Sequence, residues 1–435
     1  MPAFNFCDDF ELGAASSATQ VEGVQSDNSW QDWAARGRIK TKDDPAHAVD
    51  HAARFREDAA LMQQMGIRHA RIGVEWARIE PKEGAFDDTV LAAYADEIIE
   101  LKGRGVRPLV TLHHFTNPMW FETSGGFLDA RCVERFCRYV EHVVRYFGAM
   151  VEEYITINEP NVYAMNGYLT GDWPPGARSL SKTRRVLNHL CACHIAAYET
   201  IHRVRDEMKL ENTRVSYAHH MSAFAPKNPK SAVHRFCTNR ARQAFQGGLS
   251  RAFLTGEKSF PFRAQKRGLY CDFHAINYYA KSTIGFFCRP KMKDVPVNDL
   301  GWEIYPRGIA ECADELTALA PLPIYITENG TCDADDSYRA RYIAEHLEAL
   351  MQSGLPVKRY YHWCFTDNFE WLEGMSARFG LVALDGEERA RRVKQSGEFY
   401  SQMIREGGVT NDMDERFCRG EYPTQAKMTV EEKTV

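Results

Sequence analysis

The sequence lacks several features that would assign it to a broad class at once. It has no run of about 18 apolar residues, the length that a membrane-spanning helix requires. Its first residues show no basic segment followed by an apolar stretch, so we expect a cytoplasmic protein without a secretory leader. The 12 cysteines include no C-x-x-C pair, which favours reduced thiols over structural zinc. A G-x-S-x-G sequence is also missing, which argues against serine-hydrolase chemistry.

The chain also lacks an excess of charge of one sign. Lys and Arg number 54 against 59 Asp and Glu, a net charge of −5. Averaged over the chain, this balance predicts no nucleic-acid partner and no membrane partner. Hydrophobic residues make up 44% and charged residues 26%, which is ordinary globular usage, so 435 residues can bury a large core.

Short β-branched or aromatic segments alternate along the chain with amphipathic segments that have helical spacing. Eight such βα units predict an α/β fold consisting of a single (β/α)₈ TIM barrel. In this fold the loops after the C-terminal ends of the strands carry the chemistry. The predicted strands span residues 10–15, 67–74, 107–113, 153–158, 214–219, 273–278, 324–327 and 358–363, and the clearest helices span residues 52–65, 90–104, 131–147 and 337–353.

The end of the chain differs in composition from the rest. After a helix that we expect to end near Arg405, the sequence becomes polar, and no linker rich in Pro, Gly or Ser separates it from the barrel. We therefore divide the chain into a catalytic barrel over residues 1–407 and a polar C-terminal tail over residues 408–435. The tail is expected to be mobile.

Two glutamates fall at the ends of predicted strands. Glu159 lies in Thr-Ile-Asn-Glu-Pro at residues 156–160, and Glu328 lies in Ile-Thr-Glu-Asn-Gly at residues 326–330. Taken alone, either glutamate could be an ordinary loop residue whose carboxylate faces solvent at the rim of the barrel. Polar side chains at the ends of other strands favour a polar pocket, because such groups are costly to bury without partners. Those side chains are Gln20, Arg71, His113, Asn277, Tyr279, Trp363, Glu370 and Trp371.

A pocket of amides, carboxylates and indole rings suits a sugar, whose hydroxyls need donors and acceptors and whose C–H face stacks on tryptophan. The adjacent pairs His113-His114 and His219-His220 suggest a metal site at first sight. However, neighbouring residues of a strand point to opposite faces and cannot both bind one ion. We therefore predict no metal.

Four motifs together resemble glycoside hydrolase family 1, the retaining β-glucosidases and β-galactosidases. The family's T-x-N-E-P and [IV]-T-E-N-G motifs match residues 156–160 and 326–330. Its N-terminal signature resembles residues 10–23, and the motif of its last strand resembles residues 363–371 followed by Arg-Phe-Gly-Leu at residues 378–381. The resemblance covers roughly residues 4–405.

This resemblance implies roles for individual residues. Glu159 is then the general acid/base and Glu328 the nucleophile, while Arg71 and Tyr279 hydrogen-bond the nucleophile and hold it ionised. The sugar-binding residues implied are Gln20, His113, Asn158, Asn277, Tyr279, Trp363, Glu370, Trp371 and Phe379, with Asn158 at the 2-hydroxyl and Trp363 as the stacking floor.

The sequence departs from the family's pattern in two places. It reads His113-His114-Phe115 where many members have His-Trp-Asp, and Asn161 follows Glu-Pro where the family often has Trp. Both positions lie near the entrance for the aglycone, so they bear on leaving-group preference more than on reaction type.

The resemblance implies a cofactor-free, exo-acting β-glycosidase that acts with retention of configuration. Its substrates are small-molecule β-glycosides or short oligosaccharides, with terminal β-D-glucosides first and β-D-galactosides and β-D-fucosides beside them. One alternative is the 6-phospho-β-glycosidase branch, but that branch has Ser in place of Glu370 and adds a Lys, and no Lys occurs from Trp363 to Val393. A catalytically silent carbohydrate-binding barrel is the other alternative, although both glutamates are present.

Overall fold

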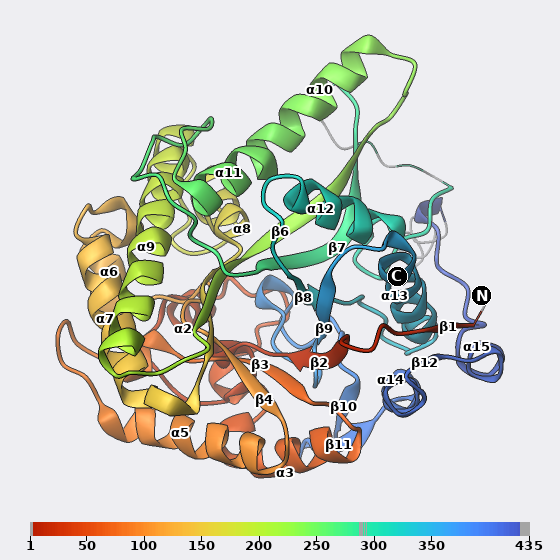
Figure 1. Ribbon diagram of the computed structural model, residues 1–435, viewed down its shortest axis with the longest axis horizontal. Coiled ribbons are helices and arrows are strands. Elements are labelled where there is room, and N and C mark those ends of the chain that lie inside the picture. The colour runs from red at the N-terminus through yellow and green to blue at the C-terminus, as the bar shows by residue number, and fades with distance from the viewer. Residues whose placement is uncertain (1–2, 287–289, 291, 293, 427–435) are drawn as a thin grey trace.

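The computed structural model describes residues 3–286, 290, 292 and 294–426. Eight parallel strands pair in sequence order and close into a barrel, which confirms the predicted (β/α)₈ fold (Figure 1). Each predicted strand is present. They are β2 (Glu11–Ala15), β3 (His69–Gly73), β4 (Arg107–Thr111), β5 (Glu153–Asn158), β6 (Arg214–Pro226), β7 (His274–Ile284), β8 (Ile324–Asn329) and β9 (Val357–Trp363).

A helix follows each strand and packs outside the barrel, and the four predicted helices are found with ends shifted by at most two residues. No helix in the described ranges is both long and apolar enough to cross a bilayer. The helices that follow the strands are α3 (His51–Gln64), α5 (Asp88–Gly103), α7 (Cys132–Phe147), α9 (Leu180–Glu207), α11 (Gly248–Thr255), α12 (Arg307–Thr317), α13 (Arg339–Ser353) and α14 (Gln395–Glu406).

The loops between strands and helices contain shorter helices and strands. Strands β6 and β7 run on beyond the barrel as a projecting pair that ends near α10 (Figure 1). The shorter elements are α1 (Ala18–Val21), α2 (Ser29–Ala35), η1 (Pro45–His47), α4 (Trp76–Ile79), α6 (Met119–Thr123), η2 (Gly126–Leu128), η3 (Gly148–Met150), α8 (Pro160–Ala164), η4 (Met165–Thr170), α10 (Ala232–Arg242), η5 (Gln243–Gly247), η6 (Trp371–Glu373), β10 (Val382–Asp385) and β11 (Ala390–Val393).

Tight packing inside the barrel requires a glycine where it closes. Gly13 pairs with His69 on β3 and with Tyr361 on β9. A Cβ atom at position 13 would lie 2.6 Å from the His69 carbonyl oxygen and 2.8 Å from the Tyr361 ring. The glycine of the N-terminal motif is therefore needed for close approach of three strands.

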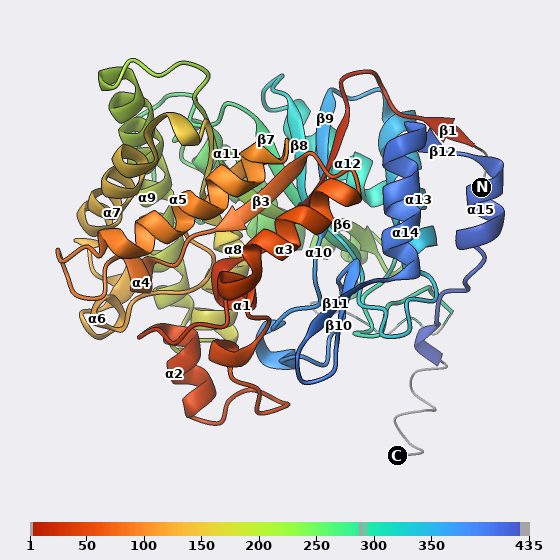
Figure 2. The same cartoon turned by 90° about the horizontal axis from the view of Figure 1, so that it is seen from below.

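The first part of the polar tail packs against the barrel, which differs from the expected free tail; residues 427–435 lie outside the described residues. Strand β12 (Gly408–Val409) pairs with β1 (Phe4–Asn5), and α15 (Asn411–Phe417) lies beside α14 (Figure 2). Met413 is fully buried and Phe417 is buried against Phe399. These two apolar residues, one turn apart in a polar sequence, attach the helix to the barrel.

We predict that Met413→Ala destabilises the protein, because it leaves a cavity between α15 and the barrel. The expected loss is about 2–4 kcal/mol of unfolding free energy, with a lower melting temperature in scanning calorimetry. Met208→Ala is the matched control, since Met208 is 38% exposed. Equal melting temperatures for the two variants would show that α15 contributes no packing energy.

Candidate active site

The polar residues predicted from the motifs converge at the C-terminal end of the barrel. Three of the strands that carry them change register there, between Ile155 and Asn158, between Ile276 and Asn277, and between Ile326 and Asn329. Such irregularities change the direction in which the neighbouring side chains point, compared with a regularly pleated strand.

Glu159 follows β5 directly, and its backbone is in the left-handed region with φ 41°. Its carboxylate oxygen Oε1 accepts a hydrogen bond from Asn277 Nδ2 at 2.8 Å and lies 3.1 Å from His220 Nδ1. A non-glycine residue in this conformation is strained, and surrounding structure must hold it there. The end of β5 thus carries the buried carboxyl group of Glu159 in contact with Asn277 and His220.

Glu328 lies in β8 and is 3% exposed. Arg71 Nη1 forms an ion pair with its Oε1, and the Tyr279 hydroxyl donates to its Oε2 at 2.5 Å. The two residues that the family resemblance assigned to this carboxylate therefore do contact it.

A hydrogen-bonded chain joins the two carboxylates. Asn158 Oδ1 accepts from Arg71 Nη2 at 2.6 Å and from Asn277 Nδ2 at 3.0 Å. Asn277 also contacts Glu159, and Arg71 contacts Glu328. The relative placement of both carboxyl groups consequently depends on two asparagines and one arginine.

Burial raises the pKa of Glu328 to about 7; the Arg71 charge and the Tyr279 hydrogen bond lower it, while the Glu159 charge raises it further. Arg71 and Tyr279 thus both act in the expected direction, toward the ionised form of Glu328, and they oppose the effect of burial.

A third carboxyl group, Glu370, faces the same space. Its Oε2 accepts from Trp363 Nε1 and from Gln20 Nε2, each at 3.3 Å. Burial raises the pKa of Glu370 to about 8, with the charges of Glu328 and Glu159 adding to the effect. Enclosure thus disfavours the charged form of this carboxyl group.

These groups surround a cavity of about 450 Å³ that both Glu159 and Glu328 line. Of the predicted residues, Tyr279, Trp363, Glu370, Trp371 and Phe379 also line it, whereas Gln20, Arg71, Asn158 and Asn277 stand behind as hydrogen-bond partners. Other residues complete the lining, and of these His114 and Phe115 were expected near the aglycone entrance: Lys40, His114, Phe115, Val162, Asn166, Trp173, His220, Asp299, Leu300, Trp302, Leu372 and Glu373.

His113 does not lie in this cavity, which corrects the prediction. Its Nε2 lies 2.9 Å from Asn117 Oδ1, and its ring packs edge-on against Phe127 and Tyr163. Strand β4 ends at Thr111, so the alternation that would aim residue 113 inward stops before it. His114 lines the cavity instead.

The His114 ring stacks 5.7 Å from Trp363 and 5.9 Å from Trp371, between centroids. Burial holds its pKa well below the usual range, so the ring is neutral. Asn158 Nδ2 is 3.1 Å from its Nε2 and can only donate, because Asn158 Oδ1 already accepts from Arg71 and Asn277. The ring proton is thus on Nδ1, which has no partner among the described residues.

The second histidine pair also divides between two environments. His219 is buried in the core beside Tyr217, while His220 lines the cavity. Within the described ranges, no group of three or more His, Cys, Asp or Glu side chains is arranged to hold a metal ion.

The cavity continues outward into a second hollow of about 560 Å³, here called the outer cavity. Its lining includes Ser222, Phe245 and Met165. The two hollows adjoin each other, because they share the lining residues Val162, Asn166, His220, Tyr279, Asp299, Leu300 and Trp302.

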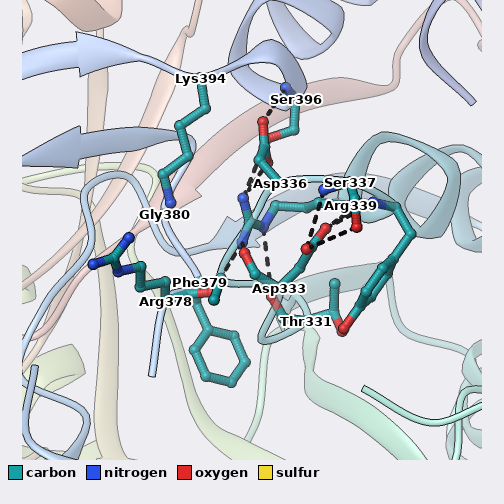
Figure 3. A network of polar contacts seen from close by, with 12 residues as sticks. Thr331, Asp333, Asp336, Ser337, Arg339, Arg378, Phe379, Gly380, Lys394 and Ser396 are labelled. Atoms are coloured by element: carbon teal, nitrogen blue, oxygen red, sulfur yellow. Dashed lines mark hydrogen bonds and ion pairs between the residues drawn. The ribbon is translucent and has the colours of Figure 1, made fainter. Parts of the chain in front are cut away.

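Hydrogen bonds join the segment that follows β8 to the loop that follows β9 (Figure 3). Arg339 Nη2 donates to the Arg378 carbonyl at 2.9 Å, beside Phe379, and the Asp333 carboxylate caps α13 by accepting from the Arg339 backbone N–H at 2.8 Å. Gly330 passes so close to Trp363 that a Cβ atom there would lie 1.9 Å from the Trp363 carbonyl oxygen. The loops that follow Glu328 and Trp363 therefore hold a fixed relative position.

Comparison with known proteins agrees with this geometry. The family model described as glycosyl hydrolase family 1 matches residues 3–266 and 274–409. A β-glucosidase A of Thermotoga maritima is 28% identical, covering 93% of this chain and 98% of its own. A β-galactosidase of Pyrococcus woesei is 27% identical, covering 95% of this chain and all of its own.

Solved structures give the same result. The β-glycosidase from Pyrococcus horikoshii superposes with a TM-score of 0.87 at 32% identity, covering 97% of this chain and 99% of that one. The Thermotoga maritima β-glucosidase in complex with glucoimidazole has a TM-score of 0.86 at 26% identity, covering 93% of this chain and all of that one. The chain belongs to glycosyl hydrolase family 1 and is a β-glycosidase.

Proposed function

We propose that the protein hydrolyses terminal, non-reducing β-D-glycosides with retention of configuration, with Glu159 as general acid/base and Glu328 as nucleophile. One observation carries this proposal: two buried carboxyl groups from different strands line one cavity, and only Glu328 is ion-paired with an arginine. The carboxylate that is paired is suited to attack carbon, and the other is suited to exchange a proton.

In the proposed reaction, Glu159 protonates the glycosidic oxygen while the ionised Glu328 attacks the anomeric carbon from the opposite face. The bond to the aglycone breaks, and a covalent glycosyl-enzyme forms on Glu328. Glu159, now a carboxylate, takes a proton from water as that water attacks the anomeric carbon and releases Glu328. Two inversions give net retention, and no cofactor takes part.

The sugar is proposed to lie over Trp363, with its hydroxyls toward Gln20, Glu370 and the surrounding ring systems. Asn158, which is joined to both catalytic groups, is assigned to the 2-hydroxyl. His114 replaces His113 as the histidine that we assign to the sugar, because its ring lines the cavity beside Trp363.

We propose β-D-glucosides as the preferred substrates, with β-D-galactosides and β-D-fucosides also accepted. A 6-phosphorylated sugar needs cations, and Lys40 is the only Lys or Arg in the described lining of the cavity. Lys40 is already paired with Glu373, and Lys394 donates to Asp367 at 2.7 Å. Both observations favour an unphosphorylated glycone over the 6-phospho alternative.

The assignment of the two glutamates is tested by rescue with azide. Glu328→Gly should lose turnover and, with azide, convert an activated β-glucoside into the α-glucosyl azide, because azide attacks from the vacated side. Glu159→Ala should instead give the β-glucosyl azide with a 2,4-dinitrophenyl substrate, since its covalent intermediate still forms. Proton NMR distinguishes the two anomers. Exchange of the two products between the variants would reverse the roles.

We predict that Arg71→Met shifts the acidic limb of the pH profile of kcat/KM to higher pH. Activity requires ionised Glu328, so the rate rises as pH increases through the pKa of this group. Arg71 lowers that pKa, so removing its charge raises it, and activity is lost first on the acidic side. Arg71→Lys, which keeps the charge, is the control. An acidic limb unmoved in Arg71→Met contradicts the pairing as the source of ionisation.

Glu370→Ala should slow hydrolysis of β-glucosides more than that of β-fucosides, which lack the 6-hydroxyl. A hydrogen bond is worth about 0.5–1.5 kcal/mol to a neutral group and about 1.5–3 kcal/mol to a charged one, so kcat/KM for the glucoside should fall about twofold to a hundredfold. Glu373→Ala is the matched control, because its carboxylate faces Lys40 at the rim. Equal loss for both sugars in Glu370→Ala would mean that Glu370 does not read the 6-hydroxyl.

A further inference from the structure

His220 contacts the proposed general acid/base, yet the proposed reaction gives it no role. Adjacent residues of a strand point to opposite faces, so His219 is buried in the core while His220 lines the cavity. Its Nδ1 lies 3.1 Å from Glu159 Oε1. The side chain is 21% exposed and lies where the cavity adjoins the outer cavity. The ring is therefore next to the point at which the aglycone leaves.

Strand β6 holds both the backbone and the side chain of Glu159. The Glu159 N–H donates to the carbonyl of Ala218 at 2.8 Å, two residues before His220. His220 is the register partner of Asn277 on β7, and Asn277 Nδ2 lies 2.8 Å from Glu159 Oε1. Two neighbouring strands thus present one hydrogen-bonding group each to the same oxygen of the carboxyl group.

The neighbours of Asn277 define which of its atoms faces Glu159. Its Oδ1 accepts from the Thr327 hydroxyl at 2.7 Å, and its Nδ2 donates to Asn158 Oδ1 at 3.0 Å. Asn158 Oδ1 also accepts from Arg71, so it cannot donate. The amide of Asn277 therefore has one orientation, and its contact with Glu159 Oε1 is a donated hydrogen bond.

The contact from His220 is also donated by the ring. In the glycosyl-enzyme Glu159 is a carboxylate, which can only accept hydrogen bonds. The ring nitrogen beside it is then Nδ1–H, whether the imidazole is neutral or protonated. His220 and Asn277 consequently both donate to Oε1, and the side-chain contacts of Glu159 with the described residues all involve this oxygen.

We propose that His220 is a positioning residue for the general acid/base. Its Nδ1–H and Asn277 Nδ2 together occupy Glu159 Oε1, so the reactive proton resides on Oε2 and meets the glycosidic oxygen there. In the first step Oε2–H gives its proton to the departing oxygen as the bond to the anomeric carbon breaks. In the second step Oε2 takes a proton from the attacking water. His220 exchanges no proton in either step. This inference rests on the proposed function, because it takes Glu159 as the acid/base.

The ring of His220 also packs against two aromatic side chains, so its packing must be separated from its role as a donor. It stacks 5.8 Å from Tyr279 and lies edge-on 5.8 Å from Phe245, between centroids. Tyr279 donates to Glu328, so lost stacking would act on the nucleophile instead. His220→Phe keeps an aromatic ring and removes the donor. His220→Asn removes the ring and keeps a donor, because the amide Nδ2 is bonded to Cγ as the ring Nδ1 is.

The dependence of kcat/KM on the leaving group tests the donor. Phenyl β-D-glucoside has a poor leaving group that needs protonation, whereas 2,4-dinitrophenolate leaves without it. A hydrogen bond to a charged group is worth about tenfold to a hundredfold in rate. His220→Phe should therefore lower kcat/KM at least about tenfold for the phenyl compound and less than about threefold for the 2,4-dinitrophenyl compound. His220→Asn should stay within about threefold of wild type on both.

Other patterns would overturn the proposal. Wild-type rates for His220→Phe on both substrates would show that the N–H is not needed. Equal losses for His220→Phe and His220→Asn with the phenyl compound would assign the effect to the ring. A loss of the same size on both substrates would assign His220 to the packing around Tyr279. The proteins are compared at equal concentrations of folded monomer or oligomer, isolated by size exclusion and checked by near-UV circular dichroism.

Hydrolysis of the glycosyl-enzyme supplies a second readout, which a packing role would not move. With the 2,4-dinitrophenyl compound the intermediate forms without acid, but its hydrolysis needs Glu159 Oε2 as base. His220→Phe should therefore lower kcat and KM together by at least about fivefold. Azide attacks without a base, so it should restore kcat and give the β-glucosyl azide. Unchanged kcat and KM in His220→Phe would contradict the assignment.

Glu159→Ala separates failure of this inference from failure of the proposed function. As the general acid, Glu159 should show the leaving-group pattern in full, with a loss of about 10²–10⁴-fold in kcat/KM on the phenyl compound and little loss on the 2,4-dinitrophenyl compound. If Glu159→Ala loses the same factor on both, the proposed function fails. If Glu159→Ala shows the pattern and His220→Phe does not, this inference alone is overturned.

Discussion

The active site depends on one buried ion pair, Arg71 with Glu328, in the interior of the barrel. Both side chains are almost completely excluded from water, and either charge alone would be costly to bury. Arg71 also donates to Thr111 at 3.0 Å and to Asn158 at 2.6 Å, so its guanidinium joins β3 to β4, β5 and β8. The hydrogen bonds that offset its desolvation are thus the same ones that position the polar groups behind the cavity.

The pair also determines the electrostatic state of the cavity. Glu159, Glu328 and Glu370 face one enclosed space, and Arg71 is the only buried cation bonded to any of them in the part of the chain that the structure describes. Burial therefore raises the pKa of Glu328 to about 7 and that of Glu370 to about 8. A sugar that enters this space replaces water around the carboxyl groups with its own hydroxyls, which are fixed donors and acceptors.

Much of the barrel could be predicted from the sequence, because eight buried parallel strands leave a repeated apolar signal and both glutamates lie at the ends of such strands. Three features could not. His114 rather than His113 lines the cavity because β4 ends at Thr111, and a strand end is defined by pairing that composition does not record. Helix α15 docks through Met413 and Phe417, two apolar residues in an otherwise polar segment. The cavity around Glu159 and Glu328 combines residues from positions 40 to 379, so only the folded chain brings its full lining together.

The central claim is that Glu328 forms a covalent bond with the sugar, and trapping that bond tests it most directly. The enzyme is incubated with 2,4-dinitrophenyl 2-deoxy-2-fluoro-β-D-glucoside, whose fluorine slows release of the intermediate more than its formation. Intact-protein mass spectrometry followed by peptide mapping should show one sugar per chain, attached to Glu328. Attachment to Glu159, or inactivation of Glu328→Gln at the wild-type rate, would contradict the account.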